Sequence, residues 1–400
     1  MSPARRASCG AWLGRLGLLL ASFALTLGLL EAALYLVPAW TRSTRDARFA
    51  FNPYRPDGAL GFTLRPGVQV RHVDRDFAVT VSVNALGGRG PDRSASKTPG
   101  TARILLLGDS FAFGWGVEQE ESFGAVVERR LTERLGPVEV LSVAVPGYST
   151  DQHYIYLRMR GLELRPDLVL LATSENDLTE LSLNRLTVDG QRFPVRVEPM
   201  WRIIDATGRM RYLGSGRPAL PRPPWPGEAW LQDHTLLYHW LRFRLAKASA
   251  AVTVRRARPT PPEWLAREPD RAIAGVSPDD LQRALAVSPA FQLRYHLRLV
   301  EAMEREVEAR GIPLRRLLVA HSGETQPADP VLARLHAECA ARGDRCLDSA
   351  RVVPAAAPGE FTFAHDPHWN REGHRRIGEA LADLLDRDPA LRRVRTSRPP

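Results

Sequence analysis

A serine follows directly after a short apolar run near residue 110. Residues 104–107 are Ile-Leu-Leu-Leu, and Gly108, Asp109 and Ser110 come next. A run of this kind predicts a strand buried on both faces, as in a parallel sheet, and the amphipathic stretch 120–135 predicts a helix beyond it. A serine between a strand and a helix has an exposed hydroxyl, and its backbone N–H lies where developing negative charge is stabilised. Ser110 is therefore a candidate nucleophile.

Donors for a developing oxyanion are expected at the ends of the next two strands. Residues 138–145 predict a strand that ends at Pro146-Gly147, and residues 167–173 predict one that ends shortly before Asn176. Ligands of open parallel sheets bind at the carboxyl ends of the strands, so these ends should meet near Ser110. Gly147 offers a backbone N–H with no side chain in front of it, and Asn176 offers an amide.

A base is expected just before the final helix, at residues 373–385. His368 is placed to take a proton from Ser110, and Asp366 is placed to orient the imidazole and to stabilise its charged form. The catalytic residues would then follow the chain order Ser, Asp, His.

Each of these residues could also have a purely structural role. Ser110 would be a helix cap, Gly147 a turn, Asn176 a loop residue and His368 a surface histidine. Four coincidences are then required, so catalysis is favoured. His365, His368 and His374 could instead bind a metal, but no matching His/Asp cluster stands out elsewhere in the sequence. We expect neither a metal nor another cofactor.

The elements that must position these residues alternate regularly. Further strands are predicted at 314–320 and 345–347, and further helices at 150–164, 279–310 and 330–342. Strands that alternate with helices predict an α/β fold with a parallel, doubly wound sheet.

The regions around this core divide the chain. Residues 1–40 predict a membrane anchor, 41–100 a juxtamembrane β segment and linker, 101–390 the catalytic domain, and 391–400 a disordered tail. Alternation of apolar and polar residues over parts of 68–83, most clearly 77–83, indicates strands in the β segment. Residues 181–278 interrupt the rhythm and are rich in Pro, Trp and Arg, so we expect an insertion that is irregular and partly helical at 235–251.

The first 40 residues carry a membrane signal. Arg5, Arg6 and Arg15 precede an apolar run over 16–37, long enough to span a bilayer. The positive flank should stay in the cytoplasm and place the rest of the chain outside. A cleaved signal peptide is the alternative, because residues 37–39 loosely resemble a cleavage site.

The net charge and the cysteines bear on the class of partner and on the compartment of the protein. The 400 residues carry a net charge of +10, but the arginines are interleaved with acids, which argues against a nucleic-acid partner. Cys339 and Cys346 could form a disulfide in an extracytoplasmic domain, or stay as two thiols. The oligomeric state is left open.

The chain resembles the SGNH hydrolase (GDSL-type esterase/lipase) superfamily over about residues 103–385. The resemblance rests on Gly108-Asp109-Ser110-Phe111, Gly147, Asn176-Asp177 and Asp366-Pro367-His368. It implies a three-layer, flavodoxin-like fold, with Ser110 as nucleophile, His368 as base and Asp366 as its partner. It also implies that Gly147 and Asn176 donate to the oxyanion together with the N–H of Ser110. The Asp-x-His-Trp form of the last block resembles SGNH-like polysaccharide acetylation proteins of bacterial envelopes.

These features predict a membrane-anchored, extracytoplasmic serine esterase that acts on carboxylic esters with acetyl or short acyl groups. Its substrate would be an acylated glycan or a lipid-like ester. Two alternatives stay open: an O-acyltransferase that acts on envelope polysaccharide, and a non-catalytic SGNH scaffold that binds glycan. A secreted location is the alternative to the anchored one.

Overall fold

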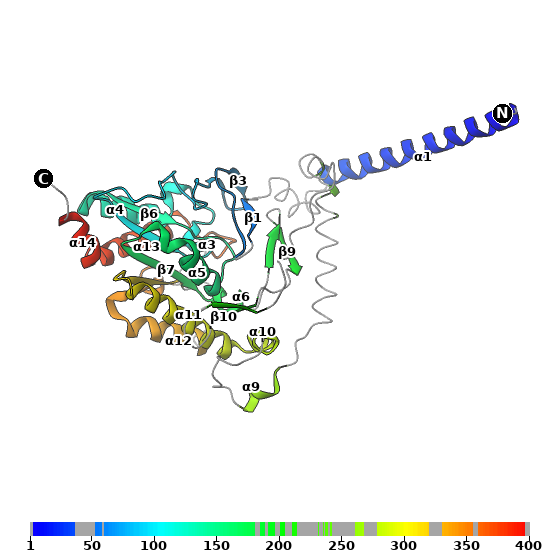
Figure 1. Ribbon diagram of the computed structural model, residues 1–400. Helices are drawn as coiled ribbons and strands as arrows, with labels where there is room; N and C mark the ends of the chain where they lie inside the picture. The colour runs from blue at the N-terminus through cyan, green and yellow to red at the C-terminus, as the bar shows by residue number, and fades with distance from the viewer. Residues whose placement is uncertain are drawn as a thin grey trace. The chain divides into compact units, whose positions relative to one another are not determined.

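The computed structural model describes most of the chain (Figure 1). The described residues are 3–36, 53–57, 60–180, 185–188, 191–196, 201–204, 210–213, 231, 235, 237, 238, 241, 261–267, 278–319, 330–354 and 359–396. The chain forms two compact units. One comprises residues 1–50 and 222–256, and the other comprises residues 51–221 and 257–400.

A five-stranded parallel sheet forms the centre of the larger unit. Its spatial order is β13-β12-β7-β5-β6. The strands are β5 (Ala102–Leu107), β6 (Val138–Ser142), β7 (Leu168–Ser174), β12 (Leu314–Val319) and β13 (Cys346–Asp348). Counted along the chain this is the order 2-1-3-4-5 of flavodoxin-like folds, so the predicted fold class is confirmed.

Helices cover both faces of this sheet. On one face α4 (Phe123–Leu135) packs against α13 (Arg371–Leu385), where Gly378 allows a close approach to Val126. On the other face α11 (Pro289–Glu308) packs against α5 (Thr150–Tyr156) and α12 (Pro330–Ala341). Right-handed crossovers in this strand order require such a division, and Figure 1 shows α4 and α12 on opposite sides of the strands.

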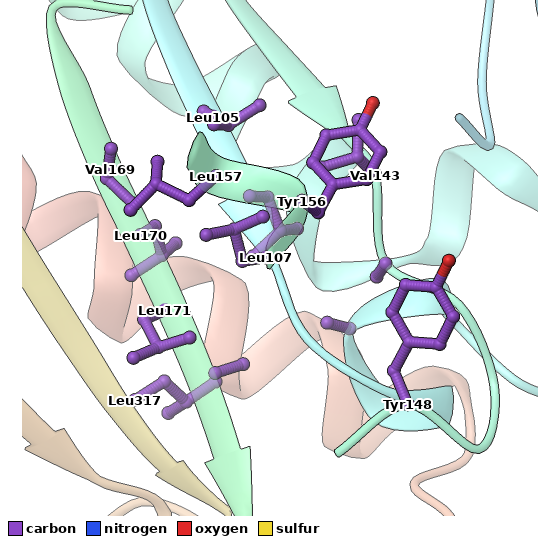
Figure 2. Close-up of a cluster of buried hydrophobic side chains, with 14 of the residues drawn as sticks. Leu105, Leu107, Val143, Tyr148, Tyr156, Leu157, Val169, Leu170, Leu171 and Leu317 are labelled. Carbon is purple, nitrogen blue, oxygen red and sulfur yellow. The ribbon is translucent and has the colours of Figure 1, made fainter. Parts of the chain in front are cut away.

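The core is densest around the two central strands. Every residue of β5 and β7 is buried. Figure 2 shows side chains of both strands, among them Leu105 and Val169, packed with Leu157 and with Leu317 of β12. Burying one such leucine stabilises the fold by roughly 1.5–3 kcal/mol. The sheet is therefore a rigid base for the loops at its carboxyl edge.

The N-terminal β segment of this unit consists of two hairpins. Strands β3 (Gln69–Val73) and β4 (Ala78–Ser82) pair within the region where alternation indicated strands. Strands β1 (Tyr54–Asp57) and β2 (Gly61–Leu64) form a further hairpin. The sequence does not indicate these two strands, because each has only four residues and one contains Pro56.

Several predicted helices end earlier or are divided. The helix expected over 150–164 is α-helical only to Tyr156, and a π-helical turn and a 3-10 turn follow to Leu164. The helix expected over 279–310 is two helices, α10 (Pro278–Val287) and α11. Ser288 caps α11, and Pro289 at its start cannot continue α10.

The insertion and the tail also differ from expectation. The described parts of the insertion include two hairpins, β8–β9 (Arg185–Val188 and Gln191–Arg196) and β10–β11 (Trp201–Ile204 and Met210–Leu213), where an irregular, helical segment was expected. The helix expected over 235–251 lies almost wholly outside the described residues. Residues Pro389–Thr396 form α14, and Leu391 is buried, where a disordered tail was expected from residue 391.

The smaller unit contains a single long helix, α1 (Pro3–Leu36), among its described residues. Its stretch Gly14–Leu34 is long and apolar enough to cross a membrane. Residues 14–30 of this stretch are exposed, whereas Leu34 at its end is buried. Glu31 in its last turns accepts a hydrogen bond from the backbone N–H of Leu237, at 2.7 Å. One such helix near the N-terminus fits a single-pass anchor or a signal sequence.

Candidate active site

Ser110 begins a one-turn helix directly after the central strand β5. The helix is α3 (Ser110–Phe113), and the Asp109 carboxylate caps it by accepting the backbone N–H of Phe111 at 3.0 Å. Gly114 ends it with a positive φ of 81°. The missing Cβ of Gly108 lets the chain turn against Ala112 and Ala172. The loop thus places the serine at the carboxyl edge, where it retains 8% exposure.

His368 and Asp366 lie in line with this serine. The Nε2 atom of His368 is 2.7 Å from the Oγ atom of Ser110. On the other side of the ring, Nδ1 is 2.5 Å from Oδ1 of Asp366, which also accepts the backbone N–H of His368 at 2.8 Å. A proton on Nδ1 therefore faces the carboxylate and leaves Nε2 as the acceptor for the serine hydroxyl.

The carboxylate of Asp366 is held in its charged form. Burial alone would raise the pKa of Asp366, but hydrogen bonds and charge interaction with His368 bring the pKa below its ordinary value. A further contribution comes from a hydrogen bond with Trp115. A charged carboxylate behind the ring stabilises the imidazolium that forms when the ring takes a proton.

Two aromatic side chains from the serine loop hold the imidazole. The ring of Phe111 lies 4.7 Å from the ring of His368, and the ring of Trp115 stacks on it at 5.4 Å. The contact of Trp115 with the imidazole of His368 explains the position of this side chain.

The histidine belongs to a short hairpin that leads into α13. Thr362 and Trp369 form a β-bridge, and the N–H of Phe363 donates to the carbonyl of His368 at 3.1 Å. Asn370 caps α13 through its Oδ1 atom and donates to the carbonyl of Thr362. Trp369 is fully buried beneath. His368 is thus fixed between a buried tryptophan and a helix cap.

Asn176 is linked to the serine loop through Asp109. Its Nδ2 donates to Oδ2 of Asp109 at 3.1 Å, and the hydroxyl of Ser174 donates to the same oxygen at 2.8 Å. Ser174 also contacts Oδ1 of Asn176. This network fixes the orientation of the amide one residue away from Ser110. Asp109 and Ser174 were not predicted as site residues, although Asp109 stands next to the serine in the sequence.

Gly147 lies on the loop after β6, and this loop contacts the turn before Ser110. The N–H of Val145 donates to the carbonyl of Gly108 at 3.1 Å. Gly147 is exposed, has a φ of 82°, and a Cβ there would meet only Phe62, at 3.8 Å. Approach to its backbone is therefore open.

A buried acid lies below this edge. Asp177 accepts the N–H of Ser174 at 2.8 Å, and Nε2 of His153 is 3.5 Å from its other oxygen. Burial raises the pKa of Asp177 to about 6. This carboxyl supports the turn that carries Asn176.

The three histidines considered as metal ligands do not converge. His365 pairs with Asp76, and Nδ1 of the buried His374 accepts the N–H of Phe123. No group of three or more His, Cys, Asp or Glu that could hold a metal is found within the described ranges.

The two cysteines of the C-terminal third are bonded to each other. Cys346, the first residue of the edge strand β13, forms a disulfide with Cys339 of α12.

Comparison with known proteins identifies one family whose model matches part of this chain. The GDSL-like Lipase/Acylhydrolase family matches residues 106–297, a range that includes Ser110, Gly147 and Asn176 and ends before Asp366. A search of curated proteins gives no match.

Solved structures are similar at low identity. A protein described as lipolytic and of the G-D-S-L family, from Desulfitobacterium hafniense DCB-2, is 12% identical. The aligned region covers 71% of this chain and 99% of that protein, with a TM-score of 0.37. TesA is 12% identical, with 71% and 97% coverage and a TM-score of 0.37. The lipase Lip_vut3 from a goat rumen metagenome is 13% identical, with 71% and 97% coverage and a TM-score of 0.38.

Proposed function

The chain belongs to the GDSL-like lipase/acylhydrolase family and is a hydrolase, and from this premise we propose that it is a serine esterase of the cell envelope. Its proposed reaction is the hydrolysis of a carboxylic ester with an acetyl or short acyl group. The observation that carries the proposal is the contact of 2.7 Å between Nε2 of His368 and Oγ of Ser110, with Asp366 behind the ring.

In the proposed acylation step, Ser110 attacks the acyl carbon while His368 takes the hydroxyl proton. The charged carboxylate of Asp366 stabilises the imidazolium. The N–H groups of Ser110 and Gly147 and the amide of Asn176 are the proposed donors to the oxyanion. The tetrahedral intermediate then collapses, and the alcohol leaves with the proton from His368.

In the deacylation step, water takes the place of the alcohol. His368 accepts a proton from water as the oxygen attacks the acyl-enzyme, and returns it to Ser110 when the carboxylic acid leaves. No redox partner or cofactor is needed, since atoms and charge balance over the two steps.

An O-acyltransferase uses the same first step, with a glycan hydroxyl in place of water in the second. The Asp366-Pro367-His368-Trp369 block favours this alternative by resemblance. Trp369 is fully buried against Phe111 and Phe123, so it supports the site from below. Incubation with an acyl donor and an oligosaccharide separates the two functions, because transfer yields an acylated glycan and hydrolysis yields free acid.

An extracytoplasmic, membrane-anchored location fits two features. The stretch Gly14–Leu34 is preceded by Arg5 and Arg6, which favours a cytoplasmic N-terminus. The Cys339–Cys346 disulfide is typical of oxidising compartments. Both support placement of the site outside the cytoplasm, where acylated glycans and lipid-like esters occur.

The test is turnover of a short-chain p-nitrophenyl ester by Ser110→Ala. We expect loss of activity to the background rate, with wild-type activity in the matched control Ser94→Ala, whose exposed side chain lies in the linker. Unchanged turnover by Ser110→Ala would contradict the proposal. Absence of turnover in the wild type, with glycan binding retained, would favour a non-catalytic scaffold.

A further inference from the structure

The loop that carries His368 is held from outside by the N-terminal β segment. Asp76, in the turn between β3 and β4, accepts two hydrogen bonds from His365. The backbone N–H of His365 donates to Oδ2 at 2.7 Å, and Nδ1 of its ring lies 2.7 Å from Oδ1. The two residues are 289 positions apart in the chain. Asp76 thus fixes both the backbone and the side chain of the residue before Asp366.

The tip of this loop has few other supports. Ala364, His365 and Pro367 are exposed, while the base of the hairpin is buried at Trp369. Within the tip, Asp366 is tied to His368 by the two bonds already described. Because only Pro367 separates these residues, a shift of the backbone at His365 moves the carboxylate and the imidazole together.

Aromatic packing at the same place joins hairpin, tip and serine loop. The ring of Phe77, next to Asp76, lies 5.0 Å from the ring of Phe363. Gly116, with a φ of 78°, sits against both rings, because a Cβ there would lie 2.6 Å from Phe363 and 2.7 Å from Phe77. The ring of His72 on β3 packs edge-on against Trp115 at 4.3 Å, and Trp115 stacks on His368.

The same segment also supports the turn after the serine. The buried guanidinium of Arg89 donates to the carbonyls of Phe113 at 2.8 Å, of Val117 at 2.6 Å, and of Gly114. Burial lowers the pKa of His72 to about 3, so its ring is neutral and adds no positive charge beside His368. The segment therefore contacts both loops that carry the proposed catalytic residues.

We propose that Asp76 is a positioning residue for the proposed reaction: through His365 it holds the loop that sets Asp366 and His368 in line with Ser110. This proposal rests on the proposed esterase function. It assigns the region between the anchor and the catalytic domain a role in catalysis, where the sequence indicated only a juxtamembrane β segment.

The experiment uses the full-length protein and compares Asp76→Ala with wild type, with Asp74→Ala as matched control. Asp74 is exposed in the same turn, and its Oδ1 atom accepts the backbone N–H of the adjacent Arg75. Active sites are titrated with a fluorophosphonate, so that kcat refers to folded sites only. We expect kcat of Asp76→Ala to fall roughly 10- to 100-fold with KM within about twofold, because misplacement of a catalytic group by about 1 Å has effects of this size.

A double-mutant comparison shows whether Asp76 acts through His365. His365→Ala removes the side-chain bond and keeps the backbone N–H, so its loss should be smaller than that of Asp76→Ala. The double variant should equal Asp76→Ala alone, and Asp76→Asn, which keeps one acceptor oxygen, should be intermediate.

Three results would overturn the proposal, and they do so in two distinguishable ways. Wild-type kcat per titrated site in Asp76→Ala, with Ser110→Ala inactive, overturns the positioning role alone. Additive losses in the double variant do the same. Full activity in Ser110→Ala overturns the proposed function and the positioning role together.

Discussion

The side-chain amide of Asn176 donates a hydrogen bond to the carboxylate of Asp109 across 3.1 Å, and the next residue after Asp109 is Ser110. The ends of β5 and β7 are thereby connected through side chains as well as through the sheet. This connection sets the orientation of the amide before any substrate binds. Preorganised donors of this kind stabilise a transition state without reorganisation at the moment of reaction.

Asn176→Ala is therefore predicted to lower kcat by about 10²- to 10³-fold, the usual effect of losing one oxyanion donor, with little change in KM. Steady-state kinetics on a p-nitrophenyl ester measure this. Thr173→Ala, a neighbouring change on β7, is the control and should keep kcat near wild type. If kcat/KM falls only because KM rises, Asn176 would contribute to substrate binding in the ground state instead.

Asp366→Asn is predicted to lower kcat by about 10⁴-fold, because an asparagine favours the wrong imidazole tautomer. The pKa of Asp366 is lowered, so the carboxylate remains charged at acidities where an ordinary aspartate begins to take up protons. The acid limb of the kcat/KM profile of the wild type should therefore not arise from Asp366. A pH profile of both proteins checks this, and a limb that disappears in Asp366→Asn would contradict it.

The buried Asp177 is predicted to make the stability of the fold depend on pH. Its pKa is raised from 3.8 to about 6 in the folded state, so the folded state binds the proton more tightly than the unfolded state. The contribution of Asp177 to the free energy of unfolding is then largest below about pH 4, falls as the pH rises to about 6 and is constant above. The change is about 3 kcal/mol, from roughly two pKa units.

Asp177→Asn removes this titration and keeps an acceptor for the N–H of Ser174. Denaturant unfolding at pH 4 and pH 7 measures the free energy of unfolding of both proteins. Relative to the wild type, the variant should be more stable at pH 7 than at pH 4. Asp344→Asn, at an exposed position, is the control. A difference between variant and wild type that is the same at both pH values would argue against a raised pKa.

The Cys339–Cys346 disulfide closes a short loop between α12 and β13. Chain entropy predicts a contribution of about 2.5 kcal/mol to the free energy of unfolding for a loop of this length. A Cys339→Ser/Cys346→Ser variant should unfold at lower denaturant concentration than the oxidised wild type, and close to the reduced wild type. Free thiols in protein isolated from its natural compartment would speak against an oxidising location.

The sequence predicted the parallel sheet and the proposed triad because both leave local signals. The apolar runs over 104–107 and 167–173 indicate buried strands, and Gly108-Asp109-Ser110 and Asp366-Pro367-His368 stand at element ends. The contact between Ser110 and His368 then follows from the order of the strands. Local pattern and global topology agree here, so the inference from one to the other holds.

The contacts of the β segment could not be predicted in the same way. Strands β1 and β2 are too short to give a clear alternation, and the pairing of Asp76 with His365 joins residues that no local pattern relates. The break between α10 and α11 was signalled by Ser288-Pro289, but the apolar periodicity continues across it. Long-range side-chain contacts of this kind depend on tertiary packing, which a single sequence does not display.

The central claim is that Ser110 is a nucleophile activated by His368. The most direct measurement is peptide mapping by mass spectrometry after reaction with a fluorophosphonate, on wild type, Ser110→Ala and His368→Ala. We predict one adduct per wild-type chain, located on Ser110, absent from Ser110→Ala and formed far more slowly in His368→Ala. Label on another residue, or equal labelling rates with and without the His368 ring, would contradict the account.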